Sequence, residues 1–194
     1  DLPDAEDFPE LMNRDWVKAK YGRPSHYASI LRGKTEDPAD YSHRRLFDAS
    51  LLTSSTLTEH TTVSRERFAA TFHGETEPIS RFLKLDPDGV CNTLRAGTAS
   101  DRGAFTSPRP IHPHSPRVIT VREAARLHSY PDWFRFHVTK WHGFRQIGNS
   151  VPPLLGRAVA GQVIAALGAK RIKAAEPIPL GDVSLLSISM NDAA

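Results

Sequence analysis

The sequence predicts an α+β fold, in which a small, irregular domain with few strands is followed by two helices. Three observations favour this fold in a chain of 194 residues. Two segments with helix-start signals, Val121–His128 and Pro152–Leu167, lie in the second half of the chain. Two strand-like segments, Phe82–Leu85 and Val90–Leu94, flank an Asp-Pro-Asp-Gly turn. Segment 97–116 contains four Pro and two Gly, which predicts a long loop.

The N-terminal third predicts short helices separated by loops. An Asp-Phe-Pro-Glu start supplies a cap, a first-turn proline and an acidic residue, which predicts a helix over 7–21. A second short helix is predicted at Tyr27–Leu31, where Gly33 stops it. Segment Thr35–Ser55 is polar and is predicted to be mostly loop, and Ser64–Ala70 is predicted to form another helical turn.

The two helices of the second half have clearer boundaries. Thr120 and Glu123 form a capping-box pattern at the start of the first helix. The second helix begins at two prolines, whose missing amide donors cost nothing at that position, and it ends at Gly168. Because this helix is apolar nearly all the way round, we expect it to be buried on most sides. The tail beyond Lys173 is predicted to be one strand or disordered.

Positive charge is concentrated in one part of the chain. Residues 91–157 contain ten Lys and Arg against three Asp and Glu, a net charge of +7, which leaves −4 for the rest because the whole chain carries +3. Such asymmetry indicates a phosphate-binding surface or, alternatively, a solvated basic face. Aromatic residues interleave with these cations, either to stack on bases or to form core: Trp133, Phe134, Phe136, Trp141 and Phe144.

The residues present exclude several classes of chemistry. The chain has no Walker phosphate loop and no G-x-G-x-x-G dinucleotide pattern. A single cysteine, Cys91, excludes an intrachain disulfide and a multi-cysteine zinc site. His112 and His114 lack carboxylate or cysteine partners at ligand spacing, so no metal site is predicted. No apolar run approaches the roughly 20 residues that span a bilayer, and no secretory leader is visible, so we expect an intracellular, cytoplasmic protein without a membrane segment.

Two stretches carry a resemblance to a known family. Residues 117–134, Arg-Val-Ile-Thr-Val-Arg-Glu-Ala-Ala-Arg-Leu-His-Ser-Tyr-Pro-Asp-Trp-Phe, resemble the ninth conserved motif of DNA cytosine-5 methyltransferases. Residues 145–155, Arg-Gln-Ile-Gly-Asn-Ser-Val-Pro-Pro-Leu-Leu, resemble the tenth motif. Upstream, residues 91–98 resemble the Thr-Leu element of the family's target-recognition region. The resemblance is strong over 91–167 and weak over 1–90.

The resemblance implies that most of the catalytic machinery lies outside this chain. The family's glycine-containing cofactor motif, Pro-Cys-Gln nucleophile loop, Glu-Asn-Val motif and Gln-x-Arg-x-Arg motif are absent. Cys91 lies in the recognition region, so no catalytic residue is assigned. The implied organisation is a target-recognition domain over 1–135, a segment over 136–172 that docks on the missing catalytic domain, and a tail over 173–194. The helix in the docking segment would complete a doubly wound, Rossmann-like methyltransferase domain.

The reaction that the resemblance implies is methyl transfer from S-adenosylmethionine to C5 of a cytosine in double-stranded DNA, in a restriction-modification system. The target base must be flipped out of the duplex, because it is unreachable in the stack. Asn149, Ser150 and Val151 match the family positions that touch the cofactor. They precede a helix start that is expected to suit the cofactor's carboxylate.

The residues expected to contact DNA lie in the recognition region: Thr93, Arg95, Arg102 and Arg109. An arginine can grip the guanine edge with two hydrogen bonds, although contact with phosphate is at least as common. By contrast, Arg122, Glu123 and Arg126 are interpreted as structural, with Glu123 committed to the capping box.

Two alternatives to a methyltransferase part remain open. The chain could be a stand-alone DNA-binding module without catalysis, or the small subunit of a split methyltransferase whose catalytic half is a separate polypeptide. A pure DNA-binding module has no need of a cofactor-contacting turn followed by a helix that is apolar all round. That feature favours the methyltransferase reading, with the catalytic half as partner.

Overall fold

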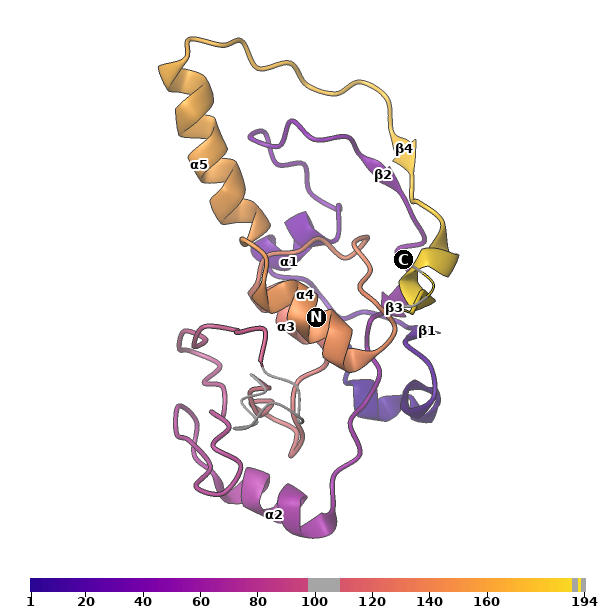
Figure 1. Ribbon diagram of the computed structural model, residues 1–194, viewed down its shortest axis with the longest axis vertical. Coiled ribbons are helices and arrows are strands. Elements are labelled where there is room, and N and C mark those ends of the chain that lie inside the picture. Colours follow the sequence, from indigo (N-terminus) through magenta and orange to yellow (C-terminus); the bar gives the residue numbers. More distant parts are fainter. Residues whose placement is uncertain (98–108, 190–191, 193–194) are drawn as a thin grey trace.

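The structure, a computed structural model, describes residues 1–97, 109–189 and 192. It combines short helices with two small two-stranded sheets, so the expected mixture of helices and few strands is confirmed. The elements follow one another along the chain (Figure 1) as η1 Ala5–Asp7, η2 Pro9–Met12, β1 Trp16–Lys18, α1 His26–Leu31, β2 Arg45–Leu46, β3 Leu51–Thr53, α2 Thr62–Ala70, α3 Val121–Leu127, α4 Lys140–Gly148, α5 Pro153–Ala166, β4 Ile178–Pro179 and η4 Val183–Ser187.

Both sheets join segments that are distant in sequence. Strand β1 runs antiparallel to β3, with Val17 opposite Leu52. Strand β2 runs parallel to β4, with Arg45 opposite Ile178, so the C-terminal tail returns along the molecule (Figure 1). The tail therefore contains the short strand that the sequence allowed.

The largest apolar cluster forms where α3 packs against α4. Ala124, Ala125 and Ile147 are fully buried in it. Gly143 of α4 lets the two helices approach closely, because a Cβ there would lie 2.9 Å from Cγ1 of Val121. Two smaller clusters lie under the N-terminal elements and under α2.

The prediction of a helix over 7–21 is wrong. The segment starts at the last residue of the 3-10 turn η1, its first half contains the 3-10 turn η2, and its second half contains strand β1. Leu11 and Val17 both point into the N-terminal cluster, and β1 obtains its backbone partners from β3, more than 30 residues further on. Long-range pairing and burial outweigh the local helix-start signal. Segment 35–55, for which the sequence predicts mostly loop, contains β3, which pairs with β1, and β2, which pairs with β4.

The prediction of strands at Phe82–Leu85 and Val90–Leu94 is also wrong. Leu83 and Lys84 form only isolated bridges, to Thr76 and Ile111 respectively. Segment 90–94 has no regular structure, and Val90 is 96% exposed. A strand needs a neighbouring strand to satisfy its backbone groups, and a single bridge does not supply one.

Four predicted helical segments are confirmed, as α1, α2, α3 and α5. At α3 the capping box forms as expected: the Glu123 amide donates to Thr120 Oγ1 over 3.2 Å, and the Thr120 amide donates to Glu123 Oε2 over 2.7 Å. Gly33 and Gly168 adopt positive φ angles of 63° and 64° where α1 and α5 end. Such angles suit glycine, which has no Cβ.

Helix α4 was not predicted. Thr139 makes no side-chain hydrogen bond at its N-cap, and two glycines lie within the helix, so the local signals are weak. The packing of the aromatic residues explains its formation. Phe144 is buried in the main cluster together with Phe136, whereas Trp141 stays partly exposed under the guanidinium of Arg145. Two of the interleaved aromatic residues are therefore core.

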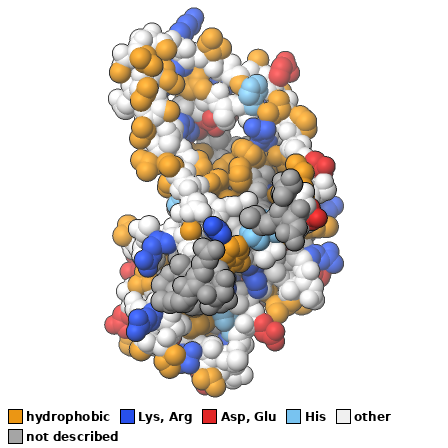
Figure 2. Space-filling model, in the orientation of Figure 1, with side chains coloured by type: hydrophobic (Ala, Val, Ile, Leu, Met, Phe, Trp, Pro, Cys, Tyr) orange, Lys and Arg blue, Asp and Glu red, His pale blue; other side chains and the backbone are white. Residues whose placement is uncertain are grey.

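Helix α5 is the main departure from the expected burial. None of its residues is buried, although it is apolar nearly all the way round. It projects from the body of the molecule (Figure 1), and hydrophobic side chains follow it in the space-filling view (Figure 2). Five exposed side chains spaced four residues apart, which we call the α5 row, are 52–76% exposed: Val151, Leu155, Val159, Val163 and Leu167. Among the described residues, no helix has the length and apolar character to cross a membrane.

Charged side chains occupy the interior around α3 instead. Arg122 is 1% exposed and donates to the Thr53 carbonyl and hydroxyl and to the Phe134 carbonyl, over 2.7–3.1 Å. Arg126 grips Asp132 with two hydrogen bonds of 2.6 and 2.7 Å. These contacts confirm that both arginines are structural.

Candidate nucleic-acid interface and cofactor turn

The turn expected to touch the cofactor, residues 149–151, lies between α4 and α5. The Asn149 amide closes the last turn of α4 by donating to the Arg145 carbonyl over 3.1 Å. Ser150 donates from both its amide and its hydroxyl to the Ile147 carbonyl, over 3.1 and 2.7 Å. Since Ile147 is fully buried, the turn is fixed to the main core.

The chemistry of this turn fits one wall of a cofactor site. Asn149 presents an exposed amide side chain, and Val151 presents an exposed apolar one. These groups suit a contact with a nucleoside-containing molecule. The turn has no carboxylate, so acceptors for the hydroxyl and amino groups of S-adenosylmethionine would have to come from elsewhere.

The start of α5 is a poor site for the cofactor's carboxylate, contrary to our expectation. Pro152 and Pro153 have no amide hydrogen. The amide of Leu154 donates to Ser129 Oγ over 3.1 Å. Few free donors therefore remain in the first turn, and anion binding at a helix start depends on such donors.

The recognition segment, which we define as residues 91–97, lies directly against the end of α4. A Cβ built on Gly148 would fall 2.3 Å from the Ala96 nitrogen. Within the segment, Leu94 is buried in the main cluster, whereas its neighbours Thr93 and Arg95 are exposed. The structure thus brings two of the expected DNA-contacting residues next to the cofactor turn.

The other two residues expected to contact DNA, Arg102 and Arg109, do not lie in the recognition segment. Arg102 lies outside the described residues. Arg109 is half-buried, and its guanidinium lies over the Phe144 ring, 5.5 Å from the ring centroid. Burial lowers the pKa of Arg109, but an arginine remains charged at neutral pH. The ring holds this cation in one orientation.

Sequence reasoning missed Lys140, the first residue of α4. Its amine donates to the Leu57 carbonyl. Burial, followed by the charge of Arg109, lowers the pKa of Lys140. Burial, followed by the charges of Arg65 and Lys140, lowers the pKa of His60, whose ring packs edge-on against Phe68. Lys140 lies between Asp132 and Glu176, a stretch that contains no other carboxylate, and this is the one sequence signal that could have indicated it.

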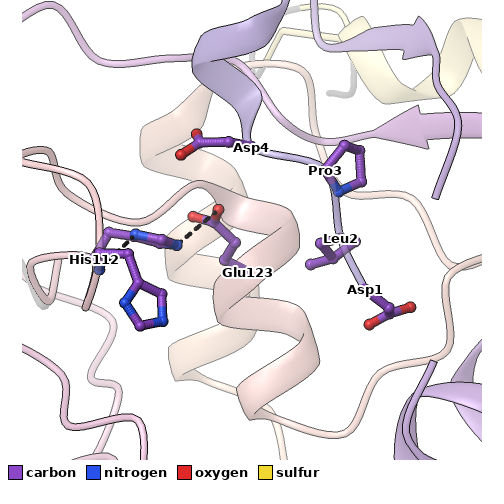
Figure 3. A pocket seen from close by; sticks show the side chains of 7 residues that line it. Asp1, Leu2, Pro3, Asp4, His112 and Glu123 are labelled. Atoms are coloured by element: carbon purple, nitrogen blue, oxygen red, sulfur yellow. Dashed lines mark hydrogen bonds and ion pairs between the residues drawn. The ribbon is translucent and has the colours of Figure 1, made fainter. Parts of the chain in front are cut away.

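Two cavities lie outside the cofactor turn. The smaller one, about 390 Å³, is lined by the N-terminal residues 1–4 with His112, His114 and Glu123 (Figure 3). Its carboxylates are engaged in ion pairs, Asp4 and Glu123 with Arg117 and Asp1 with two other arginines. No group of three metal-ligating side chains occurs in the described ranges. The larger one, about 530 Å³, lies beside the first turn of α5 and is lined in part by Tyr130 and Trp133.

Comparison with known proteins identifies the family. Residues 9–165 match the C-5 cytosine-specific DNA methylases. This match covers most of the chain, so the chain belongs to the C-5 cytosine-specific DNA methylase family. The resemblance stated from the ninth and tenth motifs is thereby confirmed.

Individual relatives are consistent with this membership. The type II methyltransferase M.XorII of Xanthomonas oryzae pv. oryzae is 71% identical over 194 residues, which is 100% of this chain and 46% of that protein. DNA (cytosine-5)-methyltransferase 1A of rice, Oryza sativa subsp. japonica, is 42% identical over 75 residues, or 35% of this chain and 5% of that protein. An E. coli crystal structure, described as a prophage-encoded DNA modification methyltransferase, matches with a TM-score of 0.61 and 37% identity over 80% of this chain and 41% of that one. The chain thus spans less than half the length of M.XorII.

Proposed function

We propose that this chain is the target-recognition and cofactor-wall part of a DNA cytosine-5 methyltransferase of a type II restriction-modification system. The observation that carries the proposal is the juxtaposition of two family motifs: the recognition segment lies against the end of α4, next to the turn at 149–151. A DNA-reading segment and a cofactor wall must be adjacent, because the methyl group passes directly from cofactor to base. Such an enzyme acts on DNA in the cytoplasm.

Each group has a proposed role in binding. Thr93 and Arg95 contact the DNA target, and Arg109, held on the Phe144 ring, contacts phosphate or a guanine edge. Asn149 and its two successors contact the cofactor, S-adenosylmethionine, which supplies the methyl group when bound.

The nucleophile belongs to the half that this chain lacks. Cys91 is unsuited to the task, because burial raises the pKa of its thiol. Its Sγ donates to the Asn92 carbonyl over 3.1 Å. A thiolate nucleophile needs the opposite environment, with a neighbouring cation or base.

The α5 row is the proposed docking surface for that catalytic half. Its side chains are exposed and none belongs to the main cluster, and an apolar surface of this kind usually marks an interaction site. This chain matches 46% of M.XorII, so more than half of that protein lies outside the match. We propose that the corresponding part of the present enzyme covers the α5 row. We propose that segment 136–172 docks on the catalytic half through this row and completes its doubly wound sheet. Residues 1–135 form the target-recognition domain, and residues 173–194 form a tail.

DNA binding tests the recognition role. Titration of the chain into labelled duplex DNA should give weak binding with a log–log salt slope of about −4 to −5, the value for roughly four to six phosphate contacts at ~0.9 each. Arg109→Ala should weaken binding and reduce this slope by about 1. Arg23→Ala removes one exposed arginine of the N-terminal region and is the matched control. Binding that does not change with salt would contradict the proposal.

Methyl transfer tests the division of labour. The chain alone, with tritiated S-adenosylmethionine and DNA, should incorporate no label. Addition of the portion of M.XorII that this chain does not match should produce incorporation. Label incorporated by the chain alone, and lost in Cys91→Ser, would show that the nucleophile is present here after all.

A further inference from the structure

Gly148 approaches the recognition segment more closely than any other residue type could. A Cβ at this position would lie 2.3 Å from the Ala96 nitrogen, 2.4 Å from the Arg95 carbonyl carbon and 2.7 Å from the Ala96 Cα. All three are backbone atoms, so no side-chain rotation can relieve the overlap. The φ angle of Gly148 is not positive, so the close approach, rather than the local conformation, requires glycine here.

The surface on which the segment rests is rigid. Ile147, the residue before Gly148, is 0% exposed, and Gly143 one turn earlier packs against Val121 of α3. The segment itself is anchored through Leu94, which is 7% exposed in the same cluster. The Arg95–Ala96 peptide bond is therefore held between its own buried neighbour and the last turn of α4.

We propose that Gly148 is a positioning residue, which fixes the recognition segment against the cofactor turn and so sets where Thr93 and Arg95 meet DNA. The DNA part of this inference rests on the proposed function. The mechanical part rests only on the contact between Gly148 and the Arg95–Ala96 bond. A Cβ at 148 displaces the segment while leaving every DNA-contacting side chain in the sequence.

Three glycines of neighbouring helices provide a matched set of variants. Gly148→Ala displaces the backbone of the recognition segment. Gly143→Ala overlaps side-chain atoms of Val121, at 2.9 and 3.0 Å, and approaches the His137 carbonyl oxygen at 3.4 Å, so it disturbs the α3–α4 core without touching the segment. Gly156→Ala meets a single atom, Cγ1 of Val151, at 3.8 Å, which is ordinary contact. The three variants separate displacement of the segment from loss of core packing and from the mere addition of a methyl group.

Limited tryptic digestion reads the contact directly, because trypsin cleaves after Arg95, at the bond that packs on Gly148. The exposed linker residues Lys170 and Arg171 provide a reference rate in the same molecule. Relative to that reference, cleavage at Arg95–Ala96 should be at least ten times faster in Gly148→Ala than in the wild type. It should be unchanged in Gly156→Ala, and Gly143→Ala should lower the melting temperature without a comparable increase. Equal cleavage at Arg95–Ala96 in all three variants overturns the proposal.

Duplex DNA of mixed sequence separates this inference from the proposed function. If the wild-type chain binds DNA, Gly148→Ala should weaken binding at least tenfold, with Gly143→Ala and Gly156→Ala within about threefold of the wild type well below their melting temperatures. Undiminished binding by Gly148→Ala overturns the positioning role. If the wild-type chain binds no DNA, the proposed function fails, and the digestion alone decides whether Gly148 holds the segment. If Gly148→Ala does not fold, the wild type decides: cleavage at Arg95–Ala96 as fast as at Lys170 and Arg171 overturns the proposal.

Discussion

Helices α3 and α5 reverse the usual relation between residue type and burial. Helix α3 has seven residues, five of which are buried, and two of these five are the arginines Arg122 and Arg126. Helix α5 has fourteen residues, most of them apolar, and none is buried. In a folded protein, charged side chains are rarely interior unless they are paired, and an extended apolar surface is rarely left exposed.

The difference separates a region whose polar groups are paired within this chain from a helix whose apolar side chains are exposed. Every buried arginine of α3 finds its acceptors here, some of them far away in sequence, such as Thr53 for Arg122. The α5 row finds no comparable cover among the described residues. The charged side chains of α3 are therefore paired within this chain, whereas the α5 row is exposed, as the proposed docking of a catalytic half would require.

The strongest test of the α3 side is Arg122→Ala. The substitution removes the Arg122 donor from the Phe134 carbonyl and from the Thr53 hydroxyl and opens a cavity, so the free energy of unfolding should fall by about 3–5 kcal/mol. Urea denaturation measures the change. Arg145→Ala, which removes an exposed guanidinium from the face of Trp141, should cost less than about 1 kcal/mol. Equal losses of unfolding free energy in the two variants would mean that the buried hydrogen bonds of Arg122 do not stabilise the fold.

The corresponding test of the α5 side is Val159→Asp. A carboxylate in the middle of the α5 row should weaken association with the complementary portion of M.XorII by about ten- to a hundredfold, or about 1–3 kcal/mol, because the charge would be desolvated without a partner. The stability of the isolated chain should change little, since Val159 is exposed. Ala158→Asp places the same charge on the same helix, about 100° away around its axis, and should have the smaller effect. An equal loss of DNA binding in Val159→Asp would mean that α5 belongs to the recognition domain.

Acid provides a third test, through Asp4, which pairs with the buried Arg117 beside α3. Partial burial raises the pKa of Asp4, but hydrogen bonds from Ser115, the Glu6 amide and Arg117 outweigh it and lower the pKa to about 2. Because the folded-state pKa is depressed, this contribution to stability is present above about pH 4 and is lost as the pH falls toward 2. Since a third of the side chain is exposed, solvent screening limits the loss to about 1 kcal/mol.

Denaturation midpoints measured between pH 5 and pH 2 check this expectation. Asp4→Asn should remove that part of the pH dependence and leave the variant less stable than the wild type at neutral pH. If the denaturation midpoints of the wild type and of Asp4→Asn differ by the same amount at every pH, the role of Asp4 is contradicted.

The smallest expected effect is that of Gly156→Ala in α5. Alanine has the higher helix propensity and meets no close atom at this position, so the helix should gain about 0.5 kcal/mol of local stability. Amide exchange in α5 should slow about twofold, with no change in α3. Faster exchange would show that α5 depends on a contact at Gly156 that we have not recognised.

The sequence alone determined the features whose signals act over a few residues. The capping box of α3 is closed by Thr120 and Glu123, three residues apart, and the end of α5 is set by Gly168. The family could also be recognised from two continuous motifs, and the cofactor turn lies within one of them. Whether Asn149 and its neighbours contact the cofactor, and whether Thr93, Arg95 and Arg109 contact DNA, stays a prediction.

The tertiary structure decided everything that depends on partners distant in sequence. The Asp-Phe-Pro-Glu start did not produce the helix predicted over 7–21, because β1 pairs with β3 and Leu11 is buried against the same cluster. Helix α4 forms without a strong cap because Phe144 and Ile147 are buried against α3. The contact between Gly148 and the Arg95–Ala96 bond joins residues more than 50 positions apart. Local hydrogen bonds are encoded within one turn of chain, whereas burial and close approach depend on which distant surface arrives, and that is a property of the whole fold.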